Sequence, residues 1–342
     1  MTRTDSPRSG PTAFVTGGTG FIGSHLVEAL LARGYAEVRC LIRQDLKWLQ
    51  GLDIVPIRGD LSSIEALWEG VGGVDYVYHV AGVTRAHDAD ALYQGNVQAT
   101  LNLMGAIKHA NPGVQGVLVT SSLAAVGRCE GPVAHEDVPL QPVSRYGASK
   151  KQMEIALATP RQDATVYLHD LPLTIVRPPA VYGPRETDIF TFFQTVSKGV
   201  CPIVGSGTKP VLSLVHVADL VRGMIEAAEH PGSHGETYFL GSEEIYAWKE
   251  IKAATTQALG RRALTLPVPR ALVGVVGAVS EAVGAITGSY PPLNREKARE
   301  IRHACTACSV EKAQRDFAFR QHVPLDEGLK ETMAWYREHA WL

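Results

Sequence analysis

The feature that most constrains this chain is a glycine-rich stretch near its beginning, Thr16-Gly17-Gly18-Thr19-Gly20-Phe21-Ile22-Gly23. A short apolar run precedes it, and the residues from His25 to Arg33 carry apolar side chains at three- and four-residue spacing. A strand, a glycine turn and a helix in this order favour binding of a dinucleotide. Its pyrophosphate is expected at the helix N-terminus, where unpaired N–H groups and the dipole attract an anion.

Three glycines of this stretch are each expected to have a different structural role. Gly17 permits the tight turn, Gly20 lets backbone N–H groups approach the pyrophosphate, and Gly23 lets the helix pack closely on the strand. Their spacing is one residue longer than the G-x-G-x-x-G form. A glycine cluster alone also fits a plain tight turn, so the prediction depends on the flanking strand and helix.

Composition excludes several classes of partner. The 342 residues are 45% hydrophobic and 20% charged, with a formal net charge of -2 and no basic run, so no nucleic-acid partner is expected. The cysteines are odd in number and scattered, which favours a reduced, cytoplasmic protein. Cys305-x-x-Cys308 lacks the second ligand pair that a zinc site needs, so no metal site is predicted. The five positions are Cys40, Cys129, Cys201, Cys305 and Cys308.

Two segments bear on membrane association. Residues 1–11 are polar and are expected to be a disordered lead-in, not a signal peptide. Ala271 to Gly288 is almost wholly apolar and 18 residues long, the lower limit for a spanning helix. Because Glu281 lies near its middle and glycines interrupt it, we expect a buried or pocket-lining helix and no membrane span.

Strand-like runs alternate with helix-period segments as far as Arg177. This alternation predicts an α/β fold of the Rossmann type, a doubly wound parallel sheet with helices on both faces. Beyond Gly183-Pro184 the pattern loosens, and after Gly241 it is mostly helical. We therefore expect an NAD(P)-binding domain at 12–184 and 214–240 and a smaller substrate lobe at 185–213 and 241–342. The predicted strands are 37–43, 54–60, 74–80, 116–120 and 173–177, and the predicted helices are 64–68, 89–109 and 146–158.

A tyrosine and a lysine lie four residues apart at Tyr146 and Lys150, and on a helix they share one face. A free tyrosine has a pKa of about 10, which a nearby ammonium lowers toward the range useful for acid–base work. Ser122 follows a predicted strand, and its hydroxyl can hydrogen-bond a substrate carbonyl or alkoxide. Alone, the pair also fits an exposed stretch of helix; with Ser122 it predicts proton transfer.

These residues together are similar to the short-chain dehydrogenase/reductase superfamily, and further motifs resemble its extended branch. That branch includes NAD(P)-dependent epimerases and dehydratases, dihydroflavonol reductases and 3β-hydroxysteroid dehydrogenases. The resemblance runs from Thr12 to the C-terminus and is specific over the first 185 residues. It implies an oxidoreductase with a bound NAD(P) and a homodimer. Besides the glycine stretch, its motifs are Gly59-Asp60, His79-Val-Ala-Gly82, Ser122, Tyr146-x-x-x-Lys150, Arg177-Pro-Pro-Ala-Val-Tyr-Gly-Pro-Arg185 and Val215-His-Val-Ala-Asp219.

The resemblance also implies a role for individual residues. Ser122 and Tyr146 would bind the reacting oxygen, Tyr146 would pass the proton, and Lys150 would hold the nicotinamide ribose and tune Tyr146. Asn96 would be structural or part of a proton relay, and both alternatives stay open. The implied cofactor contacts are the turn residues Gly17, Thr19, Gly20, Phe21, Ile22 and Gly23, then Asp60 and Leu61 at the adenine, Ala81 and Gly82 at the ribose and phosphates, and the backbone from Pro178 to Val181 at the carboxamide.

The end of the second predicted strand favours NADP over NAD. NAD-binding folds usually place Asp or Glu there, to accept from the ribose 2′-hydroxyl. This chain has Arg43, with Lys47 nearby, which could pair with a 2′-phosphate. A charge-assisted hydrogen bond contributes roughly 1.5–3 kcal/mol, which corresponds to about a 10- to 100-fold preference. An exposed arginine at a strand end is the alternative.

Departures from the epimerase pattern bear on the substrate. Epimerases of the branch usually have Asn where this chain has Ala180, an Arg-Asp pair where it has Leu212-Ser213, and tyrosine at the position of Val126. A buried diphosphate without such partners is costly, which argues against a nucleotide sugar. Arg185, Lys209 or Arg222 could substitute, and the apolar residues 268–286 would line a pocket for an apolar alcohol or ketone. The candidate substrate residues are Thr84, Ala180, Arg185 and Leu212.

The sequence thus predicts an NADP-dependent oxidoreductase that interconverts a carbonyl and a secondary alcohol of a small molecule. Two alternatives remain. One is an NAD-dependent nucleotide-sugar epimerase or dehydratase, and the other is a non-catalytic NADP-sensing protein.

Overall fold

The computed structural model describes residues 9–342 except 87, 161–165, 206, 270–272 and 275–294. The chain divides into two compact units. Unit 1 comprises Met1–Ser121, Gln152–Val176 and Val221–Tyr238, and unit 2 comprises Ser122–Lys151, Arg177–Leu220 and Phe239–Leu342. The functional division into a cofactor domain and a substrate lobe has different boundaries and stays a prediction.

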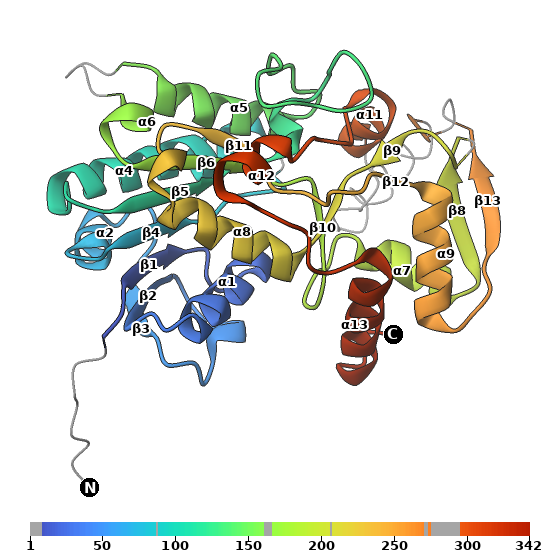
Figure 1. The fold of residues 1–342 in the computed structure, drawn as a ribbon, viewed down its shortest axis with the longest axis horizontal. Helices are drawn as coiled ribbons and strands as arrows, with labels where there is room; N and C mark the ends of the chain where they lie inside the picture. Colours follow the sequence, from blue (N-terminus) through green and yellow to red (C-terminus); the bar gives the residue numbers. More distant parts are fainter. Residues whose placement is uncertain (1–8, 87, 161–165, 206, 270–272, 275–294) are drawn as a thin grey trace, which may run out of the picture. The chain divides into compact units, whose positions relative to one another are not determined.

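A seven-stranded sheet in the order β11-β6-β5-β4-β1-β2-β3 forms the centre of unit 1 (Figure 1). Strands β1 to β6 pair in parallel, with Val15 opposite Cys40 on one side and Tyr78 on the other. The bounds are β1 Thr12–Thr16, β2 Glu37–Ile42, β3 Val55–Arg58, β4 Tyr76–His79, β5 Gly116–Thr120, β6 Leu173–Arg177 and β11 Thr237–Phe239. The predicted doubly wound α/β fold is confirmed.

Helices flank this sheet because its central strands are apolar on both faces. Every residue of β5 and β6 is buried, and Phe14, Val77 and Leu103 belong to one apolar cluster with them. Parallel sheets need helices on both faces for this reason. The helices and short helical turns of this part of the chain are α1 Phe21–Ala32, η1 Lys47–Leu49, α2 Ile64–Val71, α3 Ala89–Tyr93, the π-helix η2 Gln94–Gln98, α4 Ala99–Ala110, α5 Arg145–Ala158, α6 Tyr167–Asp170, α8 Val217–Glu229 and η4 Pro231–Ser233.

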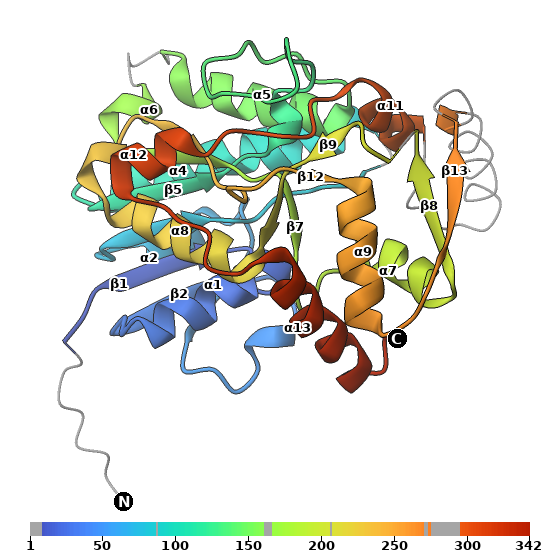
Figure 2. The ribbon, with the colours of Figure 1, turned by 45° about the vertical axis from the view of Figure 1, so that its right-hand side comes forward.

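Unit 2 is built from short strand pairs and helices (Figure 2). Its apolar core contains several aromatic side chains. Phe193 and Tyr336 are buried in that core, and α9 packs beside α13. The strand pairs are β7–β10, β9–β12 and β8–β13. The bounds are η3 Leu123–Ala125, β7 Ala180–Tyr182, α7 Phe190–Ser197, β8 Val200–Val204, β9 Val211–Leu212, β10 Leu214–His216, β12 Tyr246–Ala247, α9 Trp248–Leu259, β13 Leu264–Val268, α11 Arg295–His303, α12 Glu311–Phe317 and α13 Leu325–Glu338.

The predicted helix at 89–109 is present but not uniform. It consists of α3, the π-helical turn η2 and α4.

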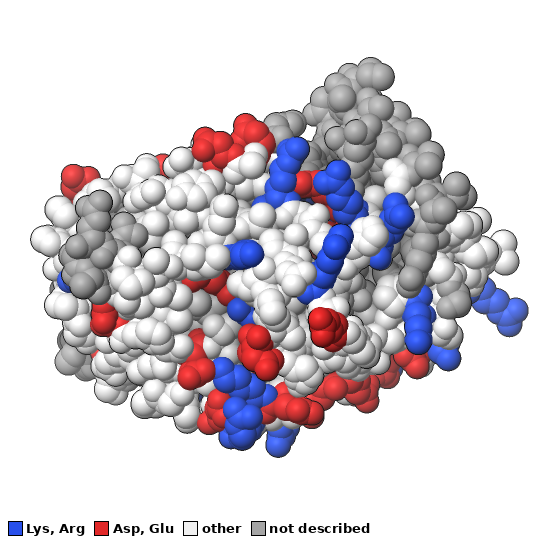
Figure 3. Space-filling model, turned by 90° about the horizontal axis from the view of Figure 1, so that it is seen from above, with Lys and Arg blue, Asp and Glu red and all other residues white. Residues whose placement is uncertain are grey.

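Most of the apolar segment 271–288, including Glu281, lies outside the described residues. Within the described ranges, no helix combines the length and apolar character needed to cross a bilayer. The molecular surface shown in Figure 3 carries both acidic and basic side chains.

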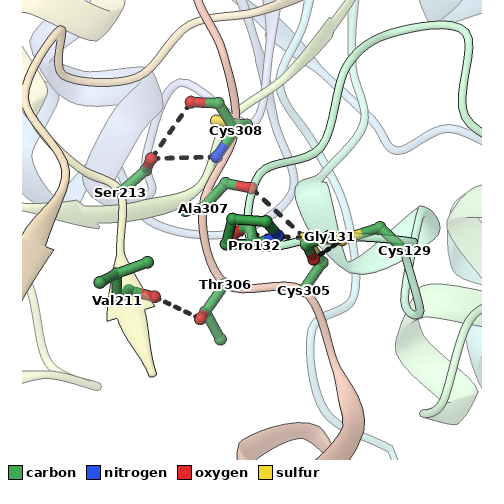
Figure 4. Close-up of a disulfide and its surroundings, with 9 residues drawn as sticks. All are labelled: Cys129, Gly131, Pro132, Val211, Ser213, Cys305, Thr306, Ala307 and Cys308. Carbon is green, nitrogen blue, oxygen red and sulfur yellow. Dashed lines mark hydrogen bonds between the residues drawn. A yellow bond between two sulfur atoms is a disulfide. The ribbon is translucent and has the colours of Figure 1, made fainter. Parts of the chain in front are cut away.

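The cysteine prediction is wrong in one respect. Cys129 and Cys305 form a disulfide with a Cα–Cα distance of 5.7 Å, whereas Cys40, Cys201 and Cys308 are free and buried (Figure 4). The two half-cystines are 176 residues apart, so their spacing in the sequence contains no sign of the pairing. Cys308 therefore does not act with Cys305 as a dithiol pair.

Candidate active site

The glycine turn between β1 and α1 has the geometry that its sequence predicts. Gly17 has a positive φ of 77°, and a Cβ placed there would lie 2.5 Å from the backbone nitrogen of Ala81. A Cβ on Gly23 would lie 2.1 Å from the carbonyl oxygen of Gly17. Because real Cβ atoms do not approach backbone so closely, both positions require glycine. The turn therefore brings α1 and the segment after β4 against the end of β1.

The N-terminus of α1 is left open for a ligand. Gly20 is its N-cap, with no side-chain hydrogen bond to the cap, and the residue is exposed. Among the described residues, a Cβ on Gly20 would have a single neighbour within 4 Å, the carbonyl oxygen of Gly17 at 3.3 Å. Unpaired N–H groups at a helix start form a site for a phosphate. These residues fit the pyrophosphate of a dinucleotide.

Arg43 and Lys47, the residues predicted to select NADP, are both exposed beyond the end of β2. Among the described residues, no ion pair or hydrogen bond engages the Arg43 guanidinium. Asp60, by contrast, is engaged locally: its Oδ1 accepts hydrogen bonds from the backbone N–H and the hydroxyl of Ser62 at 2.8 and 2.6 Å. These bonds lower the pKa of Asp60. Asp60 therefore shapes the turn before α2, and Leu61 follows it half-buried.

The segment after β4 is held by Asn96. Its side-chain oxygen accepts from the backbone N–H of Val83 at 2.7 Å, and its amide nitrogen donates to the carbonyl of Val83 at 2.9 Å. Asn96 lies in the π-helical turn η2 and is buried. These bonds give Asn96 a structural role, and a part in a proton relay stays a prediction. It fixes the backbone that follows Ala81 and Gly82, and Thr84 is exposed one residue further on.

Unit 2 brings Ser122 and Tyr146 together. The Ser122 hydroxyl is hydrogen-bonded to the Tyr146 phenol, and Ser122 Oγ accepts from the backbone N–H of Ala124 at 3.1 Å. A hydroxyl has one proton and two lone pairs, so the bond from Ala124 leaves Ser122 Oγ one proton and one lone pair for other partners. A Cβ on Gly147 would lie 2.2 Å from the carbonyl oxygen of Ala124, so α5 packs tightly against η3. This close packing sets the separation of the two hydroxyls.

The expected lowering of the Tyr146 pKa is not observed. Burial raises the pKa of Tyr146 to about 12, which outweighs the opposing effect of the Ser122 hydrogen bond. The carboxylates of Glu300 and Asp188 add to the increase, because negative charges disfavour the phenolate. Lys150 is buried on α5, one helical turn after Tyr146. In this structure desolvation therefore dominates the pKa.

The remaining candidates of unit 2 surround β7. The carbonyl oxygen of Pro178 accepts from the N–H of Leu123 at 2.9 Å, which ties the start of β7 to η3. Ala180 is exposed, Val181 is half-buried, and β7 pairs in parallel with β10. Arg185 follows β7 with a positive φ of 74°.

Leu212 and Ser213 occupy the positions where epimerases usually have an Arg-Asp pair, and both are at least partly buried. Leu212 is half-buried in β9. The Ser213 hydroxyl accepts from the backbone N–H of Cys308 at 3.0 Å and lies 3.3 Å from the Cys308 carbonyl oxygen, to which it donates. Ser213 is fully buried, so its hydroxyl belongs to the interior of unit 2.

Sequence reasoning missed two carboxylates next to these segments. Glu154, buried on α5, accepts a hydrogen bond from the hydroxyl of Ser121, the neighbour of Ser122. Glu296 of α11 contacts Arg145, the neighbour of Tyr146. The local sequence pattern predicts neither contact, because the partners are 33 and 151 residues apart.

A model of the NAD dependent epimerase/dehydratase family matches residues 13–241, which include the glycine turn, Ser122, Tyr146 and Lys150. This chain belongs to that family. The predicted resemblance is confirmed, and the protein is an NAD(P)-dependent enzyme of the extended short-chain dehydrogenase/reductase type.

Individual members of the family differ in their substrates. Ceramide reductase of Caulobacter vibrioides is 28% identical over 340 residues, which cover 96% of this chain and 95% of that protein. The 2-alkyl-3-oxoalkanoate reductase of Stenotrophomonas maltophilia is 27% identical over 334 residues, 94% of this chain and 98% of that protein. The structure of the dTDP-glucose 4,6-dehydratase of Streptomyces venezuelae with NAD bound is similar with a TM-score of 0.74, 26% identity and coverage of 96% of this chain and 98% of that one.

Proposed function

We propose that this enzyme is an NADP-dependent oxidoreductase that interconverts a carbonyl and a secondary alcohol. The observation that carries the proposal is the hydrogen-bonded pair of Ser122 and Tyr146, with Lys150 one turn further along α5. Bound nicotinamide supplies or accepts the hydride. Tyr146 donates its phenolic proton to the alkoxide oxygen during reduction and takes it back during oxidation. Ser122 orients the substrate oxygen toward that proton.

Lys150 has two tasks in this proposal. Its ammonium binds the nicotinamide ribose, and its charge favours the phenolate that Tyr146 becomes after donating its proton. The glycine turn from Gly17 to Gly23 and the open start of α1 hold the pyrophosphate. The backbone near Pro178 and Val181 faces the carboxamide.

An apolar substrate fits the chemistry of the positions that differ from epimerases. Ala180 and Leu212 offer no group to a diphosphate, and Ser213 is committed to the backbone of Cys308. Two relatives are named as reductases of ceramide and of 2-alkyl-3-oxoalkanoate, both of which carry alkyl chains. We therefore propose a ketone or alcohol with an apolar chain as the substrate, bound by a homodimeric enzyme.

A thermal-shift screen with NADPH, NADH, nucleotide sugars and apolar ketones tests the proposal, because ligands of the native state raise its melting temperature. NADPH is expected to give the largest shift, and an apolar ketone is expected to oxidise NADPH in an absorbance assay. Equal shifts with NADPH and NADH would contradict the cofactor preference. No ketone turnover, together with unimpaired NADPH binding, would favour an NADP-sensing protein.

The second candidate is an NAD-dependent nucleotide-sugar dehydratase or epimerase. The similarity to the NAD-bound dTDP-glucose 4,6-dehydratase favours it. Such an enzyme regenerates its cofactor in each cycle and often retains it. Identification of the dinucleotide that copurifies with the protein therefore separates the two candidates: tightly bound NAD supports the dehydratase or epimerase.

Replacing Arg43 tests the cofactor preference directly. We expect Arg43→Ala to weaken NADPH binding by about 10- to 100-fold, because one charge-assisted hydrogen bond to the 2′-phosphate is lost. NADH binding should stay unchanged, since NADH has a 2′-hydroxyl. Titration of both cofactors measures this, with the exposed Lys198→Ala as a control for the lost positive charge. An equal loss for NADPH and NADH would contradict the assignment.

A further inference from the structure

Helix α11 contacts the start of the helix that carries Tyr146. Oε1 of Glu296 accepts a hydrogen bond from the backbone N–H of Arg145 at 3.2 Å and lies 3.4 Å from its Nε. Arg145 is the first residue of α5, and Tyr146 is the second. The first N–H groups of a helix lack partners within it, and a carboxylate there is favoured by the helix dipole. Glu296 therefore caps α5 from a distant part of the chain.

The other end of α11 is joined to the segment that carries Ser122. The helix ends at His303, and Cys305 forms the disulfide with Cys129. The backbone N–H of Cys305 also donates to the carbonyl of Gly127 at 2.6 Å. Gly127 is the second residue after η3, whose N-cap is Ser122 and whose C-cap is Val126. The disulfide and this hydrogen bond thus fix the residues that follow Ser122.

The segment after α11 is itself firmly held. Ala134 donates to the carbonyl of Ala307 at 2.8 Å, and Thr306 Oγ1 donates to the carbonyl of Val211 at 2.5 Å. The Ser213 hydroxyl bonds both the N–H and the carbonyl of Cys308 (Figure 4). Cys308 also packs in one apolar cluster with Leu123 and Val126 of the Ser122 segment. This segment is therefore packed against the residues that follow Ser122.

We propose that α11 and residues 304–308 position Tyr146 and Ser122 relative to each other, with Glu296 as one anchor and the Cys129–Cys305 disulfide as the other. The inference rests on the proposed reactive roles of Ser122 and Tyr146. Both anchors are positioning groups, because Glu296 acts through Arg145 and the disulfide acts through Gly127. Since reacting groups must keep their alignment closely, a displacement of about 1 Å reduces the rate by up to about 100-fold.

The first test replaces Glu296. We expect Glu296→Ala to lower kcat about 10-fold while the NADPH dissociation constant stays within about twofold, because the turn that binds pyrophosphate is untouched. Glu296→Gln keeps an oxygen that accepts from Arg145 and should restore part of kcat. Glu338→Ala, at an exposed site on α13, is the control and should behave as wild type.

The second test breaks the disulfide. Denatured oxidised protein should contain three titratable thiols, and reduced protein five. Dithiothreitol delivers two electrons and two protons to the disulfide, which becomes two thiols, and is itself oxidised to a cyclic disulfide. We expect reduction to lower kcat of the wild type about 10-fold, the Cys129→Ser/Cys305→Ser variant to show the same loss, and dithiothreitol to have no effect on that variant.

Wild-type kcat in Glu296→Ala, in reduced protein and in the double variant would overturn the proposal. A lower melting temperature with unchanged kcat and pH profile would also overturn it, because the anchors would then only stabilise the fold. Five thiols in air-oxidised protein would remove the disulfide as an anchor. Failure of the proposed function is distinguishable, since Tyr146→Phe would then retain turnover.

Discussion

Replacing Tyr146 by phenylalanine should abolish turnover and leave the cofactor site intact. The substitution removes only the hydroxyl, which is the proposed proton donor and the partner of Ser122. General acid–base groups contribute roughly 10²- to 10⁴-fold, so kcat should fall by about that factor. The ring that packs at the start of α5 remains, so stability should change by only about 1 kcal/mol for the lost hydrogen bond. Steady-state rates with NADPH and a responsive ketone measure the effect.

The control for this variant is Tyr93→Phe, which removes a hydroxyl from an exposed tyrosine on α3 and should leave kcat unchanged. NADPH titration of Tyr146→Phe should give a dissociation constant within a few-fold of wild type, because the pyrophosphate and adenine contacts are retained. Turnover of Tyr146→Phe near the wild-type rate would refute the role of Tyr146 in proton transfer.

Filling the glycine turn should abolish cofactor binding. The Cβ of Gly20→Val would meet only the carbonyl oxygen of Gly17, at 3.3 Å, so the branched side chain should extend into the space proposed for the pyrophosphate. Overpacking typically costs 1–3 kcal/mol, so NADPH affinity should fall by at least about 10- to 100-fold. The melting temperature without ligand should change little, and NADPH should no longer raise it.

Gly23→Ala provides the contrast. Its Cβ would lie 2.1 Å from the Gly17 carbonyl oxygen, so α1 must move and the protein itself should lose stability. Gly113→Val is the neutral control, because a Cβ there has no neighbour within 4 Å. Wild-type NADPH affinity in Gly20→Val would show that the open start of α1 does not hold the cofactor.

Local patterns were sufficient for the sheet and the glycine turn. The alternation of apolar strands with helix-period segments depends on neighbouring residues only, and so do the positive φ of Gly17 and the close approach of Gly23 to Gly17. The pairing of Tyr146 with Lys150 also follows from helix geometry. The family could be recognised for the same reason, since each of its motifs is short and its residues are close together in the chain.

Burial and contacts between distant segments required the tertiary structure. Burial raises the Tyr146 pKa, and this effect depends on everything packed around the phenol, whereas the sequence shows only the lysine four residues away. The two hydrogen bonds from Asn96 to Val83 likewise join residues 13 apart, and the sequence pattern does not predict them.

The sequence by itself determined the α/β fold, the phosphate-binding turn and the family, because each depends on residues close together in the chain. Only the tertiary structure decided what surrounds Ser122 and Tyr146. The disulfide between Cys129 and Cys305 and the cap from Glu296 to Arg145 join segments 176 and 151 residues apart. Such contacts depend on how the whole chain packs, so they cannot be predicted from the periodicity of apolar residues or the spacing of motifs.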